Sequence, residues 1–331
     1  MMRPRGSSVL TEAESGLLGV MHTLGPPENP VTRVQVYDAR GQERGSYETQ
    51  GKLAEQYPGA VLVGSEGVVF GWAADARIEF HTARGGRRTV NLFPDAPLCQ
   101  ERPLAMATDA HGSCVAVVTQ CYVQAGHGLA DTNHATAVVF SPEGQEKWRR
   151  PLAGEMAASI AVAPWGALIV ASSYTWQSHH TRLLRFTEVF DVKGERLGTF
   201  PLLTRKVLFS SDRRRLLLAE KRSLSFLSLG SGGIQWTWNE LPSAEHFVAA
   251  VAATASLDTC AVVAAAARLK DAHFVHADME MAILDHRGEV LDRHTFSGQE
   301  ALVPVVHATR DLKTIAVGFS NHYVVLKRCD E

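Results

Sequence analysis

The sequence lacks the cysteine patterns that zinc sites and disulfide scaffolds need. It contains five cysteines, an odd number at irregular spacing, and no two of them are separated by two residues. Cys114 and Cys260 lie inside apolar runs, where a free thiol packs as a small hydrophobe. The cysteines therefore indicate buried free thiols in a reducing compartment.

An excess of charge of either sign is also missing. The 33 Lys and Arg residues nearly balance the 35 Asp and Glu residues, which gives a formal net charge of -2. A protein that holds nucleic acid or an anionic membrane through its overall charge is usually clearly basic. The balance therefore argues against both kinds of partner.

No segment has the form of a signal peptide or a membrane span. The N-terminal stretch MMRPRGSSVLTEAESG has basic residues but no apolar run after them. The longest apolar run, residues 247–267, is interrupted by Asp258 and by hydroxyl residues. This run is typical of two β-strands joined by a turn, and we expect a cytoplasmic protein.

The short motifs of common enzyme classes are absent as well. The sequence has no P-loop, no GxGxxG after a strand, no HExxH and no GxSxG. Separated residues can still form a catalytic site that no motif reveals. The missing motifs favour a non-enzymatic protein without a cofactor, and an enzyme is the alternative.

The sequence does contain a repeated pair of hairpins. The second hairpin of each pair is an alternating apolar strand, a turn with glycine, which adopts positive φ readily, and another short strand. Its copies begin at Val34, Ile78, Ala137, Thr187, Leu224, Glu280 and His322. The turn glycines are Gly41, Gly85, Gly144, Gly194, Gly232 and Gly288.

The first hairpin of each pair is an apolar strand, a tight turn with Asp or Gly, and a second apolar strand. Its copies begin at Ser8, Ala60, Leu104, Ser159, Lys206, Val248 and Val303. Each pair gives four antiparallel strands, A to D from the centre outward. Seven pairs predict an all-β fold, a seven-bladed β-propeller of four-stranded antiparallel blades. Six or eight blades are the alternatives.

The predicted blades together form a single domain over residues 1–331. Their approximate ranges are 8–50, 51–95, 96–152, 153–202, 203–240, 241–298 and 299–331. The last range has no sequence for strand D. We expect the segment Val9 to Thr11 to supply that strand, which leaves the first blade short but protects the edge of the sheet; imperfect closure of the ring is the alternative.

Three stretches resemble known propellers. LFSSDRRRLLLAE, residues 208–220, resembles the inner hairpin of WD40-like propellers, while FSPEGQEKWRRPL and FDVKGERLGTF resemble hairpins of quinoprotein-like (PQQ-type) propellers. The resemblance extends over nearly the whole chain at the level of the fold. The Gly-His and Trp-Asp dipeptides of WD40 repeats are missing, and no quinoprotein ligand set matches. The resemblance implies a propeller fold, but it does not indicate whether the protein is a binding protein, a scaffold or an enzyme.

Three connections between strands B and C are unusually long, and long loops in compact domains are often binding elements. They cover residues 121–136, 172–187 and 267–280, and the strand order places them on one face. Tyr and Trp are favoured at interface hot spots, although packing against the chain's own hairpins is the alternative. The candidate partner-binding residues are His127, His134, Tyr174, Trp176, His179, His180, His273, Phe274 and His276.

These loops favour a protein-interaction module, or a subunit of a larger assembly, with another protein as partner. The alternative is an enzyme, or a sensor of a small molecule or metal, with its site at the mouth of the channel. No metal is expected, because neighbouring residues such as His179 and His180 point to opposite sides of a strand. Arg-rich turns near Arg87, Lys147 and Arg213 are interpreted as solvated turns, with an RNA contact as the weaker alternative.

Overall fold

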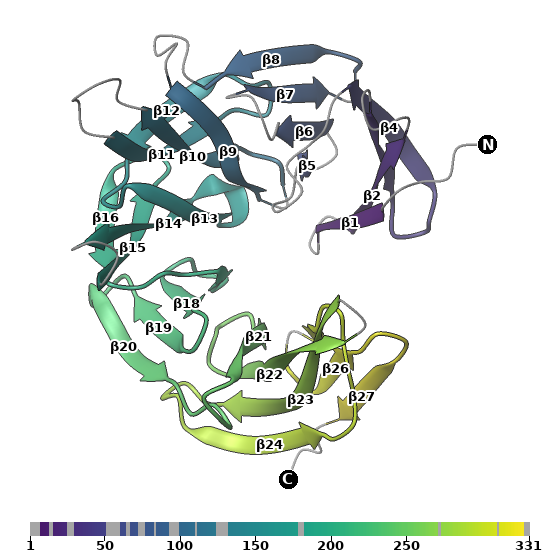
Figure 1. Cartoon of the computed structure of the whole chain (residues 1–331), viewed down its shortest axis with the longest axis vertical. Helices are drawn as coiled ribbons and strands as arrows, with labels where there is room; N and C mark the ends of the chain where they lie inside the picture. The colour runs from purple at the N-terminus through teal and green to yellow at the C-terminus, as the bar shows by residue number, and fades with distance from the viewer. Residues whose placement is uncertain are drawn as a thin grey trace. The chain divides into compact units, whose positions relative to one another are not determined.

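The computed structural model consists of strands in seven antiparallel sheets, with one 3₁₀ turn at Pro164–Gly166. It describes residues 7–12, 16–24, 30–50, 60–63, 67–71, 77–82, 84–92, 99–109, 111–123, 132–177, 182–270, 273–309 and 311–327. Contacts divide the chain into two compact units, Met1–Leu203 and Thr204–Glu331. Figure 1 shows the strands of each unit.

The first unit holds four sheets, each built from consecutive strands. The first two are β1 (Ser7–Glu12), β2 (Leu17–Leu24), β3 (Val31–Tyr37) and β4 (Glu43–Gln50), then β5 (Ala60–Val63), β6 (Gly67–Gly71), β7 (Arg77–Thr82) and β8 (Arg87–Asn91). The third and fourth are β9 (Cys99–Thr108), β10 (Val115–Val123), β11 (Thr132–Phe140) and β12 (Glu146–Pro151), then β13 (Met156–Val162), β14 (Leu168–Gln177), β15 (Arg182–Asp191) and β16 (Arg196–Phe200).

The second unit holds three sheets. The fifth is β17 (Lys206–Phe209), β18 (Arg215–Ala219), β19 (Leu224–Ser228) and β20 (Gly233–Trp238). The sixth is β21 (His246–Ala253), β22 (Cys260–Lys270), β23 (His273–Leu284) and β24 (Val290–Phe296). The seventh, over the residues that the structure describes, is β25 (Val305–Ala308), β26 (Thr314–Gly318) and β27 (Tyr323–Lys327).

The apolar cores lie between neighbouring sheets of a unit. One core joins the second and third sheets, where the rings of Phe80 and Phe140 meet edge to face with centroids 5.7 Å apart. Another joins the sixth and seventh sheets around Met281 and Val317. Both faces of a middle strand are thus covered, which explains why β6 and β18 are almost continuously apolar and buried.

The outer hairpins turn as the sequence predicts. All six predicted turn glycines have positive φ, between +70° and +81°. In five of these turns a side-chain oxygen at the first position accepts an N–H four residues on; for example, Asp191 Oδ1 accepts from the N–H of Glu195 at 2.7 Å. These bonds fix the turn locally and set the register of strands C and D.

Large aromatic side chains join successive sheets at these turns. Trp148, on β12, packs on the turn at Gly194 and donates its indole N–H to the carbonyl of Val192 at 3.2 Å. Trp236, on β20, packs on the turn at Gly288 and donates to the carbonyl of His286 at 2.7 Å. The glycine is needed at this point because its backbone contacts the indole directly.

Two expectations about particular segments have clear outcomes. The apolar run 247–267 forms β21 and β22 joined by a turn, as predicted. The segment Val9 to Thr11 does not complete the last sheet, because β1 pairs with β2 inside the first sheet, with Val9 opposite Val20. That pairing fixes the place of β1 in the first sheet. No helix in the described part of the chain is long and apolar enough to cross a membrane.

Candidate protein-docking site

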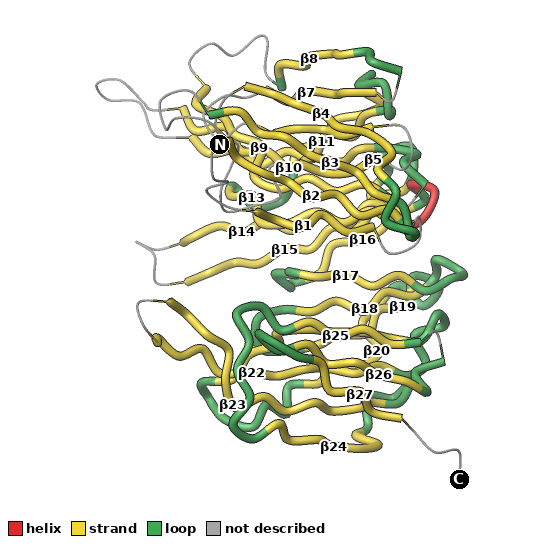
Figure 2. The backbone as a smooth tube through the Cα atoms, turned by 90° about the vertical axis from the view of Figure 1, so that its right-hand side faces the viewer, coloured by secondary structure: helices red, strands yellow, loops and turns green. Residues whose placement is uncertain are grey.

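Two of the three long connections between strands B and C, those of the fourth and sixth sheets, are largely strand in their described residues, which corrects the prediction of loops there. In the sixth sheet, β22 and β23 pair as far as Lys270 opposite His273 (Figure 2). In the fourth sheet, β14 and β15 pair as far as Gln177 opposite Arg182. The polar residues of these stretches form hairpin extensions beyond the inner strands. These extensions do not pack on an apolar core, so their sequences do not need alternating apolar residues.

The end of the β22–β23 hairpin carries exposed apolar side chains. Leu269 and Phe274 are directly opposite each other across the two strands, so their side chains share a face. Leu269 is 68% exposed and Phe274 is 70% exposed. Large apolar side chains in such an exposed pair are a feature of contact surfaces.

A second segment brings two more apolar residues to the same hairpin. His276 and Ala301 form an antiparallel bridge, with N–H to carbonyl distances of 2.7 Å and 2.9 Å. The His276 imidazole Nδ1 lies 3.0 Å from the carbonyl of Leu302, which fixes Nδ1 as the donor. Leu302 and Val303 follow Ala301 directly and are 59% and 73% exposed. We call Leu269, Phe274, Leu302 and Val303 the hairpin patch.

Charged side chains next to the hairpin patch in the sequence are paired with one another. Lys270 Nζ lies 2.7 Å from a carboxylate oxygen of Glu300, which ties the hairpin to the second segment. Arg268 pairs with Asp278 across the hairpin. Arg268 and Lys270 alternate with Leu269 along β22, so they lie on the opposite face of the hairpin, and both are already paired with acidic side chains.

The hairpin is held at its base by buried contacts. Val275, Ala277 and Met279 are buried on one face of β23. His246 is 8% exposed, and its Nε2 donates to the carbonyl of Asp278 at 2.9 Å while Nδ1 meets the Ser243 hydroxyl at 2.8 Å. The carbonyl can only accept, so it fixes the tautomer of His246. The patch thus rests on a defined scaffold.

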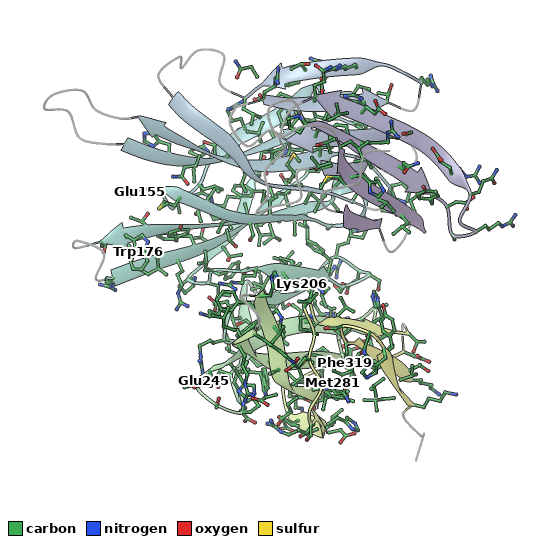
Figure 3. All side chains as sticks on the ribbon, turned by 45° about the vertical axis from the view of Figure 1, so that its right-hand side comes forward. Glu155, Trp176, Lys206, Glu245, Met281 and Phe319 are labelled. Carbon is green, nitrogen blue, oxygen red and sulfur yellow. The ribbon has the colours of Figure 1, made fainter. Side chains whose placement is uncertain are left out.

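The β14–β15 hairpin presents a smaller surface in the first unit. Trp176 is 42% exposed and lies opposite Leu183 near the end of the hairpin (Figure 3). Tyr174 is partly buried and lies opposite both Met156 and Arg185, within the three-stranded part of the sheet. Of this predicted pair, Trp176 is thus the more accessible residue.

The structure groups the other predicted residues only in part. His273, Phe274 and His276 are on β23, and His134 is exposed on β11. His127, His179 and His180 lie outside the described residues. Within the described residues, no group of three or more His, Cys, Asp and Glu side chains lies close enough to hold a metal ion.

Sequence reasoning missed three members of the hairpin patch, Leu269, Leu302 and Val303. Leu269 stands between Arg268 and Lys270, and Leu302 and Val303 follow a polar connection. An isolated apolar residue flanked by charges was the available signal. Only the bridge between His276 and Ala301 brings the two segments together.

The Arg-rich turns mostly have partners in the structure. Arg215 pairs with Asp258 at 2.7 Å, and Arg87 pairs with Glu79. Lys147 donates to the carbonyl of Ser113 at 3.0 Å, and Arg150 donates to that of Gly194 at 2.9 Å. These contacts support the interpretation of the clusters as structural, solvated turns.

No protein-family model matches the chain, and no curated protein matches it in sequence. Solved structures match in fold. The Dos1 propeller has a TM-score of 0.57 and 10% identity, over 96% of this chain and 77% of that one. The Swd1 β-propeller domain of Myceliophteria thermophila gives 0.52 and 11%, over 99% and 100%. The C-terminal WD40 domain of Sif2 gives 0.53 and 8%, over 100% and 99%.

This chain has a WD40-like β-propeller fold. The seven sheets are its seven blades, which confirms the predicted fold class and the resemblance to WD40-like propellers. At these identities the likeness is one of fold alone. The function of this WD40-like propeller must therefore be argued from its own surfaces.

Proposed function

We propose that this WD40-like propeller is a protein-interaction module that binds a partner protein through the hairpin patch. The observation that carries the proposal is the presence of four large, exposed apolar side chains, Leu269, Phe274, Leu302 and Val303, on two segments that the His276–Ala301 bridge joins. Monomeric proteins seldom expose such clusters unless the surface binds something.

Two further points support an interaction role. The charged residues on either side of Leu269 are paired with acidic side chains and lie on the opposite face of the strand, so the side chains of the patch that lose water on binding are apolar. The solved structures with a similar fold include the WD40 domain of Sif2 and the propeller of Dos1. We place the protein in the cytoplasm as part of the same proposal, because buried free Cys114 and Cys260 suit a reducing compartment.

The test is a matched capture experiment with the full chain as bait in its native cells. The Leu269→Ser, Phe274→Ser double variant removes the apolar centre. Leu291→Ser, at another exposed apolar residue of the same blade, is the control. Loss of a hot-spot side chain costs about 2 kcal/mol or more, or about 30-fold in affinity.

We expect a stoichiometric partner that the wild-type chain and Leu291→Ser retain and the double variant loses. Thermal unfolding of the three proteins should be similar, since all three positions are exposed. Equal capture by the double variant, or no stoichiometric protein with any bait, would overturn the proposal.

A further inference from the structure

The seventh blade differs from the other six in its outer edge. Each of the other sheets has four strands, whereas the described residues of the seventh form β25, β26 and β27. Within those residues, β27 pairs with β26 on one side and with no strand on the other. An edge of this kind offers a row of backbone N–H and carbonyl groups to another strand.

The fifth blade, in the same unit, shows what covers the equivalent edge. Its β18–β19 hairpin and the β26–β27 hairpin have the same length, with Ala219 opposite Leu224 and Gly318 opposite Tyr323. Both close with the same hydrogen bond, from Glu220 to Ser223 and from Phe319 to His322, each at 2.9 Å. β27 therefore corresponds residue by residue to β19, which pairs with β20 along its outer edge.

The hydrogen-bond pattern shows which groups of β27 face outward. The N–H of Phe319 donates to the carbonyl of His322, so these two residues form a hydrogen-bonded pair. In an antiparallel pair such pairs alternate with non-bonded ones, so the backbone groups of Val324 and Leu326 also point toward β26. The backbone groups of Tyr323, Val325 and Lys327 then point to the open edge. Their equivalents in β19 are Leu224, Phe226 and Ser228, which pair with β20.

Side chains indicate which kind of strand would fit. In the fifth blade, Trp238 is opposite Leu224 and Trp236 is opposite Phe226. Leu224 and Phe226 are 0% and 6% exposed, whereas Tyr323 and Val325 are 63% and 56% exposed. Large apolar residues at alternate positions of an added strand would extend the same cross-strand pairs.

Charge gives a third requirement. Strands C and D of several blades are joined by an ion pair, such as Glu188 with Arg196 at 2.9 Å and Glu280 with Arg293 at 2.6 Å. On β27 the charged residue is the exposed Lys327, which has no acidic partner among the described residues. An acidic residue opposite Lys327 would supply the corresponding pair.

We propose that an extended segment of a partner protein adds to β27 as the fourth strand of the seventh blade. It runs antiparallel to β27 and carries an acidic residue opposite Lys327. Large apolar residues opposite Val325 and Tyr323 follow three and five residues later, the spacing that the bulge in β20 gives to Gly233, Trp236 and Trp238. The first strand of the chain is not this segment, since β1 pairs with β2. We favour a single added strand over a second propeller domain as the occupant of this edge. The neighbouring sixth blade has a fourth strand, β24, which extends one strand further out than β27 does. This site is independent of the hairpin patch.

The probe is a fluorescent peptide with the sequence of residues 233–239, GIQWTWN, carrying Gly233→Asp. Its binding to the full chain is followed by fluorescence anisotropy. We expect saturable binding that Lys327→Glu weakens about fivefold, since a cross-strand charge pair contributes up to about 1 kcal/mol. A peptide with Gly233→Lys should bind Lys327→Glu better than it binds the wild-type chain. Lys221→Glu, an equal change of charge on an exposed turn, should bind like wild type.

Hydrogen exchange tests the edge itself. In the full chain without peptide, the amides of Tyr323, Val325 and Lys327 should exchange quickly, while those of Val324 and Leu326 are protected. The peptide should protect the first three, and Val325→Pro should weaken its binding at least fivefold. Protection of those three amides without peptide would mean that the chain's own residues or a second copy cover the edge, and it would overturn the proposal. So would peptide binding that neither Lys327→Glu nor Val325→Pro changes.

Discussion

At the scale of single residues, turn conformation makes the strongest demands on the sequence. The outer turns place glycine at positive φ, and some are also in contact with an aromatic ring of the preceding blade. A Cβ added at Gly288 would lie 2.8 Å from Trp236, whereas a Cβ added at Gly232 would meet nothing within 4 Å. A substitution at Gly232 therefore tests the backbone strain of positive φ alone, whereas one at Gly288 tests that strain together with the close contact to the indole.

We predict that Gly288→Ala destabilises the protein more than Gly232→Ala does. Both place Ala at positive φ, near +80° and +70°, which costs about 1 kcal/mol. Gly288→Ala must also displace the indole of Trp236, and overpacking adds about 1 to 3 kcal/mol. Urea unfolding measures both losses, and equal losses would show that the indole contact does not restrict the turn.

Arg213 shows the opposite case, an ordinary side chain where glycine fits better. Its φ is +59° in the turn between β17 and β18. We predict that Arg213→Gly stabilises the protein by up to about 1 kcal/mol, because the left-handed strain outweighs the greater freedom of glycine in the unfolded chain. The neighbouring Arg214→Gly should instead lose about 0.5 to 1 kcal/mol, since Arg214 has no positive φ. Denaturant midpoints of the two variants should shift in opposite directions.

At the scale of strands, two buried carboxyl groups link outer strands in different ways. Burial alone would raise the pKa of Glu79, but hydrogen bonds from Thr49, Arg87 and His81 hold it below its ordinary value. For Glu188 burial prevails, and its pKa is raised although the N–H of Ala153 and the Arg196 guanidinium favour the charged form.

These shifts predict opposite dependences on pH. A lowered pKa makes Glu79 stabilise the fold above its ordinary value of 4.5, and this stability is lost as the pH falls. A raised pKa makes Glu188 favour the fold at low pH, and this contribution is lost as the pH rises through the folded-state pKa. Relative to wild type, Glu79→Gln should therefore lose more stability at pH 7 than at pH 4. Glu188→Gln should lose more at pH 4 than at pH 7.

Thermal unfolding of both variants and wild type between pH 3 and pH 7 provides the measurement. The wild-type curve is the control, because other carboxyl groups titrate equally in all three proteins. If the two stability differences changed with pH in the same direction, one of the assigned shifts would be wrong.

The strands were predictable because two local signals coincided in them. Alternating or continuous apolar residues marked each strand, and glycine or Asp marked each turn, as in the hairpin around Asp191 and Gly194. The extensions of β22 and β14 were not predictable, because strands that leave the core have no buried face to impose a pattern. The same reason hid Leu269 and Leu302, whose proximity depends on a long-range bridge. The place of β1 was misjudged because a short segment with two adjacent apolar residues, Val9 and Leu10, does not itself indicate which strand it pairs with.

At the scale of the whole molecule, stability comes from the contacts between blades. Each apolar core contains residues of two consecutive blades, such as Leu217 with Val262 and Met281 with Val317. A blade alone would leave both faces exposed, so its stability depends on its neighbours, as in other repeat architectures. The repeat also continues across the boundary at Leu203, since β16 ends at Phe200 and β17 begins at Lys206. We propose on these grounds that residues 1–331 fold as a single domain.

The two buried thiols test this proposal, one in each compact unit. Burial raises the pKa of Cys114 to about 11 and that of Cys260 to about 12, so neither forms the reactive thiolate in the folded chain. With Cys99, Cys121 and Cys329 replaced by Ser, and either Cys114 or Cys260 also replaced by Ala, each variant keeps one thiol. Pulse labelling across a urea series should give the same midpoint for both variants, after correction for any change in their overall stability by circular dichroism. A midpoint for Cys114 clearly different from that for Cys260 would mean that the two units unfold separately, and that cooperation between blades stops at residue 203.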